Sequence, residues 1–185
     1  MNNSKTVLIV GCARSGTTLL SELLSQHPDI FISPETKYFQ YIYSQRFLLK
    51  LLPEKERYKL YLKSLINAEY SNREQSIIPQ YSDELLKAFS RQKDLSILFN
   101  DILSIICGEH QIVGEKTPWH TFFVDKVSSD CKVIAITRRA VPNIASLYKR
   151  KGFRNVKTID ACMSRWIHTN ESILSFASGR SEEHT

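Results

Sequence analysis

The chain has 185 residues, enough for one domain with a single buried core but not for two of ordinary size. Hydrophobic residues make up 42% of it and charged residues 24%, as in an ordinary globular protein, and no apolar run is long enough for a membrane-spanning helix. The net charge of +6 fits an anionic ligand, but no basic block interleaved with aromatic residues suggests a nucleic-acid groove.

The first predicted elements are a strand, a helix and a second strand. Residues 6–10 form a continuous apolar run that stops at Gly11, which is typical of a central strand in a parallel sheet covered on both faces. Leucines then repeat along one face of residues 17–26, which predicts a helix that ends before Pro28. Residues 30–32 are expected to form another buried strand.

The middle of the chain is predicted to be helical. Apolar residues repeat at helical spacing in residues 58–66 and again in residues 95–106. Between these segments, residues 71–83 are polar and contain a proline, which favours a loop.

A strand–helix rhythm resumes after residue 110. The pattern predicts strands at residues 112–113 and 132–136, and helices at residues 119–127, 141–150 and 158–177. Strands that alternate with helices imply an α/β fold with three layers, in which a central parallel sheet lies between two layers of helices.

We expect one domain over residues 1–178, incomplete at its C-terminus. Residues 179–185 break off the last helical pattern abruptly, and we interpret them as a non-native tail. The N-terminus enters the first strand without the hydrophobic stretch of a signal peptide, so we expect a cytoplasmic protein. The four cysteines show no C-x-x-C spacing and the five histidines no ligand motif, so neither a disulfide framework nor a metal site is expected.

The segment between the first strand and the first helix has the arrangement of a phosphate-binding loop. It consists of Gly11, Cys12, Ala13, Arg14, Ser15, Gly16, Thr17 and Thr18. Unpaired amides and the helix dipole favour an anion at such a helix N-terminus. The glycines have the Walker A spacing, but Thr17 stands where an ATPase or GTPase has its lysine, and Arg14 supplies a cation instead. The alternative is a tight turn without a ligand.

A second feature argues against a standard magnesium nucleotide site. The strand at residues 132–136, which would carry the magnesium-positioning acid, is followed by Thr137, Arg138 and Arg139. We therefore expect the protein's own cations to neutralise a bound nucleotide.

These residues resemble those of the sulfotransferases that use PAPS (3′-phosphoadenosine 5′-phosphosulfate). In that family the 5′-phosphosulfate loop has the form G-x-x-[RK]-[ST]-G-[TS]-[TS], which residues 11–18 match throughout. The family also has an arginine at a strand end and a serine eight residues later, which together hold the 3′-phosphate; Arg138 and Ser146 have this spacing. Members often carry Arg-Asp-Pro where this chain has Arg138-Arg139-Ala140, which leaves open whether Arg139 shares the role of Arg138.

The resemblance covers residues 5–50 and 110–178. The segment around Glu35 is similar to the region where many members place a catalytic glutamate, and the segment around Lys116 is similar to one that lines the active site of carbohydrate- and tyrosine-modifying branches. Trp166 also falls in a recurring family pattern, although its helical spacing favours a core position. The resemblance implies a P-loop NTPase-like sulfotransferase fold.

The resemblance further implies an enzyme of EC 2.8.2 type, with PAPS as co-substrate and no metal, that sulfates a hydroxyl or amine. Arg14 and the loop amides would stabilise the departing oxygen, Glu35 would act as general base, and Lys116 would orient the sulfate or the acceptor. The non-functional alternatives are that Glu35 is a glutamate in the first turn of a helix, and that Lys116 is a surface lysine at the start of a helix. Two other functions remain open, a magnesium-dependent P-loop small-molecule kinase and a non-catalytic nucleotide-binding fragment. The acceptor (a carbohydrate, a protein tyrosine or a small molecule) and the oligomeric state are not identified.

Overall fold

The computed structural model describes residues 5–33, 35–70, 78–150 and 158–182, and a four-stranded parallel sheet lies at its centre. Its strands are β1 (Lys5–Gly11), β2 (Ile30–Ser33), β3 (Ile112–Lys116) and β4 (Lys132–Ile136). Their order in the sheet is β2-β3-β1-β4, and every neighbouring pair is parallel. All four predicted strands are confirmed, and the carboxyl ends of all four lie along one edge of the sheet.

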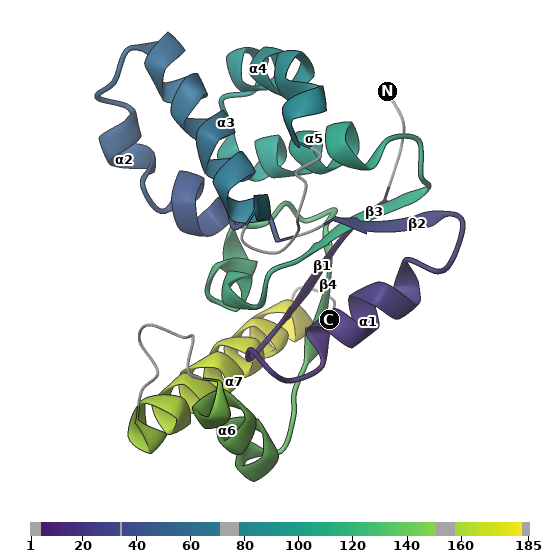
Figure 1. The fold of residues 1–185 in the computed structure, drawn as a ribbon, viewed down its shortest axis with the longest axis vertical. Coiled ribbons are helices and arrows are strands. Elements are labelled where there is room, and N and C mark those ends of the chain that lie inside the picture. The colour runs from purple at the N-terminus through teal and green to yellow at the C-terminus, as the bar shows by residue number, and fades with distance from the viewer. Residues whose placement is uncertain (1–4, 34, 71–77, 151–157, 183–185) are drawn as a thin grey trace.

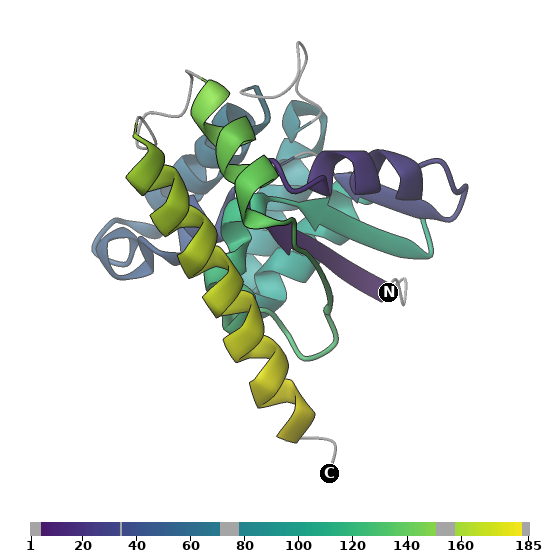
Figure 2. The same ribbon diagram turned by 90° about the horizontal axis from the view of Figure 1, so that it is seen from below.

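Helices cover both faces of this sheet, as the three-layer prediction requires. Figure 1 shows α3, α4 and α5 on one side of the strands and α1, α6 and α7 on the other, and Figure 2 shows α6 beside α7. The helices are α1 (Thr17–Leu24), a π-helix η1 (Phe39–Tyr43), α2 (Arg46–Leu49), α3 (Glu54–Tyr70), a 3₁₀ helix η2 (Ile78–Tyr81), α4 (Ser82–Arg91), α5 (Leu95–Cys107), a 3₁₀ helix η3 (Pro118–Lys126), α6 (Ala140–Lys149) and α7 (Ile159–Glu182).

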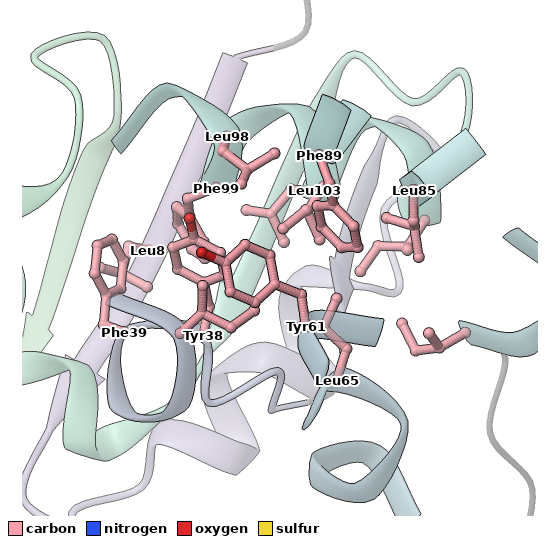
Figure 3. Close-up of a cluster of buried hydrophobic side chains, with 14 of the residues drawn as sticks. Leu8, Tyr38, Phe39, Tyr61, Leu65, Leu85, Phe89, Leu98, Phe99 and Leu103 are labelled. Atoms are coloured by element: carbon pink, nitrogen blue, oxygen red, sulfur yellow. The ribbon is translucent and has the colours of Figure 1, made fainter. Parts of the chain in front are cut away.

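The main hydrophobic core fills the space between the sheet and the middle helices. Leu8 and Val10 share one face of β1, because side chains two residues apart point the same way, and both are fully buried in this core. Figure 3 shows the apolar side chains that meet them; those labelled are Tyr38, Phe39, Tyr61, Leu65, Leu85, Phe89, Leu98, Phe99 and Leu103. Each fully buried leucine or phenylalanine contributes about 1.5–3 kcal/mol, so this cluster holds the helical middle onto the sheet.

The structure corrects the sequence-based expectations at several helices. The predicted loop at residues 71–83 falls partly outside the described residues, but η2 begins at Ile78 and α4 at Ser82, because Leu85 and Phe89 bury one face of a helix there. The predicted helix at residues 119–127 has 3₁₀ winding.

The last helix also differs from its prediction. It continues to Glu182, past Gly179, where the apolar pattern ends. One glycine in an exposed helix costs only about 1 kcal/mol, which is not enough to end it. The origin of residues 179–185 stays a prediction.

Two further properties concern the described residues alone. Among them, no helix is long and apolar enough to cross a membrane. Within the same ranges, no group of three or more His, Cys, Asp or Glu side chains is arranged to hold a metal ion.

Candidate functional site

Most of the predicted site residues lie at or shortly after the carboxyl ends of the four strands, and Ser146 lies on α6. Gly11 ends β1, Lys116 ends β3, Glu35 follows β2 by two residues, and Arg138 follows β4 by two residues. In an open α/β sheet this edge is where ligands bind. Because β1 pairs with both β3 and β4, the phosphate-type loop lies between Lys116 on one side and Arg138 on the other.

The loop from Gly11 to Thr18 adopts a compact anion-binding shape. The Ser15 N–H donates to the Cys12 carbonyl at 3.0 Å, which closes a turn. Arg14 has a φ of 73° and Gly16 a φ of 111°, both in the left-handed region, so the backbone bends sharply before α1. No side chain caps α1 at Gly16, which leaves the N–H groups of its first turn for an anion.

Two buried side chains that the sequence did not single out hold this loop in place. The hydroxyl oxygen of Thr121, in η3, accepts a hydrogen bond from the Gly11 N–H at 3.0 Å. The fully buried Asn143, in the first turn of α6, donates from Nδ2 to the Ala13 carbonyl at 3.3 Å. Both contacts join segments more than a hundred residues apart, so no local pattern reveals them.

We expect Gly11→Ala to destabilise the fold by about 1–3 kcal/mol, the range of an overpacked core substitution. An added Cβ would lie 2.4 Å from the backbone carbonyl oxygen of Ile136 in β4, and the φ of 152° is rarely adopted by other residues. The free energy of unfolding in urea measures the effect. The matched control is Gly179→Ala, because an added Cβ there has no neighbour within 4 Å. Equal effects of the two substitutions would contradict the prediction.

The side chains of the loop differ in what they offer to a ligand. Cys12 and Ala13 are buried in a small second core, and burial raises the pKa of the Cys12 thiol, so Cys12 offers only its backbone. The Ser15 hydroxyl oxygen is buried and has no hydrogen-bond partner among the described residues. Thr18 is exposed at the loop surface, whereas Thr17 is only 3% exposed.

The structure joins the loop to the pair formed by Arg138 and Ser146. Nε of Arg14 donates to the Ser146 hydroxyl at 3.1 Å, and Nη1 of Arg138 donates to the Arg14 carbonyl at 3.0 Å. Trp166 is partly buried, and its Nε1 donates to the Arg138 carbonyl at 2.9 Å, so it fixes this strand end as well as packing. Arg139 is the N-cap residue of α6.

An open cavity of about 650 Å³ lies beside this junction. It is lined by Arg14, Pro142, Ala145, Ser146, Lys149 and Arg150. Three of the six carry a positive charge and none a negative one, so the cavity suits an anion.

The structure also brings Glu35 and Lys116 together, although they are 81 residues apart in the chain. The Lys116 Nζ lies 2.6 Å from Oε1 of Glu35, and their side chains are only 12% and 20% exposed. The structure contradicts the placements that the two non-functional alternatives assumed: Lys116 ends a strand and is mostly buried, and Glu35 lies outside any helix. A carboxylate and an ammonium held at the sheet edge can accept a proton and attract an anion.

The neighbouring Glu115 is a further residue that the sequence analysis missed. It is fully buried, in contact with His120 and with two threonine side chains. The available signal was a carboxylate two residues after a predicted strand, but because the expected strand stopped at residue 113, the burial of Glu115 was not foreseen.

Comparisons with known proteins bear on this arrangement. A model of the sulfotransferase family matches residues 6–181. Two solved structures are similar in fold. One is a sulfotransferase domain from the curacin biosynthetic pathway, with a TM-score of 0.60, 17% identity, and coverage of 96% of this chain and 64% of that one. The other is a sulfotransferase domain from the olefin synthase of Synechococcus PCC 7002, with a TM-score of 0.58, 17% identity, and coverage of 95% and 62%.

These likenesses confirm the predicted fold, a parallel sheet of the P-loop-like kind with helices on both faces. The chain spans less than two thirds of the length of either domain. None of the curated proteins compared with it matches.

Proposed function

The chain belongs to the sulfotransferase family, and from this premise we propose that it transfers a sulfuryl group from PAPS to a hydroxyl or amine of an acceptor. The observation that carries the proposal is the contact between Arg14 and Ser146, 3.1 Å from Nε to the hydroxyl oxygen, with Arg138 bound to the same loop. This contact joins two groups of residues that the family resemblance assigns separately to the two phosphorylated ends of one nucleotide.

The donor would lie across the loop and the start of α6. The amides at the start of α1, with the hydroxyls of Ser15 and Thr18, would hold the 5′-phosphosulfate, because a helix N-terminus and neighbouring donors suit a multiply charged anion. Arg138 and Ser146 would hold the 3′-phosphate, which ATP lacks. Lys149 and Arg150 add positive charge to the same cavity.

Transfer requires the acceptor to face the sulfur atom, in line with the bond that breaks. The acceptor oxygen or nitrogen would bond to sulfur as the bond from sulfur to the bridging oxygen of the donor breaks. Glu35 would take the acceptor's proton, and Lys116, held 2.6 Å from Glu35, would orient this carboxylate and attract the sulfate. Arg14 would stabilise the negative charge on the departing PAP (3′-phosphoadenosine 5′-phosphate).

Calorimetric titration of the full chain with PAP, without metal, is the first test. We expect PAP to bind without a metal ion, and 5′-AMP, which lacks the 3′-phosphate, to bind about tenfold or more weakly, because a charge-assisted contact contributes about 1.5–3 kcal/mol. A preference for magnesium-ATP over PAP would contradict the proposal and favour a small-molecule kinase.

Activity is then measured with sulfur-35-labelled PAPS and a panel of carbohydrates, tyrosine peptides and small alcohols. Label transfer to any of them supports the proposal and identifies the acceptor class. Tight binding of PAP without transfer to any acceptor would favour a non-catalytic nucleotide-binding domain.

A further inference from the structure

A second acidic residue, Glu115, lies beside the pair formed by Glu35 and Lys116 but is buried inside the protein. Glu115 and His120 are completely buried, and Thr36 and Thr117 are 4% and 1% exposed. The proposed chemistry uses none of these side chains. A buried carboxylate is costly unless hydrogen bonds and nearby charge compensate it, so its contacts need an explanation.

The Glu115 carboxylate gathers donors from both sides of the β2–β3 junction. Its Oε1 accepts from the Thr36 N–H at 2.6 Å and from the Thr36 hydroxyl at 2.8 Å. The Thr117 hydroxyl donates to the same oxygen. Two of these bonds come from the segment after β2 and one from the segment after β3, so one carboxylate links both.

His120 occupies the other side of the carboxylate. Its Nδ1 lies 2.8 Å from Oε2 of Glu115, within ion-pair distance. Its Nε2 accepts from the Phe39 N–H at 3.3 Å, which assigns the ring proton to Nδ1, facing the carboxylate. The ring also packs edge-on against Phe39. His120 thereby ties the start of η1 to the same centre.

The backbone at Lys37, four residues after the end of β2, is strained and needs such a tie. Register pairing of β2 with β3 ends at Ser33 and Glu115, and residues 35–37 belong to no strand. Lys37 has a φ of 52°, in the left-handed region, and the Tyr38 N–H donates to the Thr36 hydroxyl at 3.2 Å. A non-glycine residue in this conformation persists only where its surroundings fix it.

From this geometry we propose that Glu115, with Thr36 and His120, is a positioning residue that sets the separation of Glu35 and Lys116. Glu35 directly precedes Thr36, and Lys116 directly follows Glu115. The two bonds from Thr36 to Glu115 therefore join the backbones that carry the two reactive side chains. The inference rests on the proposed function for its catalytic meaning, but the separation itself is a structural quantity.

The ionisation of Glu115 agrees with this role. Burial by itself favours the neutral acid, but His120 and the hydroxyls of Thr117 and Thr36 outweigh burial and hold the pKa of Glu115 below its ordinary value. The group is thus a carboxylate at neutral pH, an acceptor that binds each donor more strongly than a neutral amide would.

The decisive variant is Thr36→Val, which removes one hydroxyl at nearly constant volume. We expect kcat for sulfuryl transfer to fall about 10–100-fold, the scale of a displacement of about 1 Å, with the Kd of PAP unchanged. Thr36→Ser keeps the hydroxyl and should restore kcat. Glu115→Gln is the second variant, because its amide would place an N–H donor against the Nδ1–H of His120. A crystal structure of Thr36→Val should show the Glu35–Lys116 pair beyond ion-pair distance.

A positioning role also predicts that the effects of Thr36→Val and Lys116→Met on kcat are not additive. In a Lys116→Met background, Thr36→Val should cause little further loss of kcat, because the pair is already broken. Leu85→Ala, a destabilising core substitution in α4, serves as the control and should leave kcat of the folded protein unchanged. Additive losses, a parallel loss of PAP affinity, or an intact ion pair in Thr36→Val would overturn the inference. If the wild-type chain transfers no sulfuryl group, the proposed function fails, while the crystallographic distance still tests the positioning.

Discussion

Glu35→Gln is expected to lower kcat for sulfuryl transfer by about 10²–10⁴-fold, the range for loss of a general base, while the Kd of PAP stays unchanged. The amide is nearly the same size as the carboxylate but cannot accept the acceptor's proton. Affinity for PAP should survive because the groups proposed to bind it lie in the loop after β1, at the start of α1, just after β4 and on α6, whereas Glu35 follows β2. Steady-state rates with sulfur-35-labelled PAPS and calorimetry with PAP measure the two quantities separately.

The matched control for Glu35 is Glu109→Gln. Glu109 is exposed and lies before β3, at the opposite edge of the sheet. Its substitution therefore removes the same charge without touching the site. It should change neither rate nor affinity. If Glu35→Gln kept the wild-type kcat, Glu35 would not be the base, and its bond to Lys116 would be a structural ion pair only.

Arg138→Ala is expected to weaken PAP binding by about 10–100-fold, because a hydrogen bond to a charged group contributes about 1.5–3 kcal/mol and 1.4 kcal/mol corresponds to a factor of ten. The affinity for 5′-AMP should change far less, since that nucleotide lacks the 3′-phosphate. The comparison of the two nucleotides is needed because Arg138 also donates to the Arg14 carbonyl. General damage to the loop would weaken the binding of PAP and of 5′-AMP alike. Calorimetric titration of both nucleotides separates the two effects.

Arg139→Ala is the natural control for Arg138, since it is adjacent, exposed and equally charged. Arg138 is the one bound to the loop, and Arg139 is the N-cap residue of α6. We therefore expect Arg139→Ala to weaken the binding of PAP only slightly, through the loss of a long-range charge interaction. Equal losses for the two variants would mean that the arginines share the 3′-phosphate.

Much of the fold was predictable because its signals are local. Each strand contains a short apolar run, and the pattern of residues 95–106 repeats at helical spacing, so α5 could be placed within two residues. The helical middle was harder, because α4 begins in a polar segment next to a proline and only the packing of Leu85 and Phe89 makes it a helix. The length of α7 was missed because the residues after position 177 carry no apolar pattern.

The sequence by itself determined the loop from Gly11 to Thr18, its position between a strand and a helix, and the spacing of Arg138 and Ser146, which are the features that we propose bind the donor. These features lie within short segments, where residue spacing alone sets their relative positions. Only the tertiary structure decided that β3 lies between β2 and β1, which brings Lys116 to Glu35. It alone revealed the buried contact of Glu115 with Thr36, because strand order and contacts between distant segments depend on how the whole core packs.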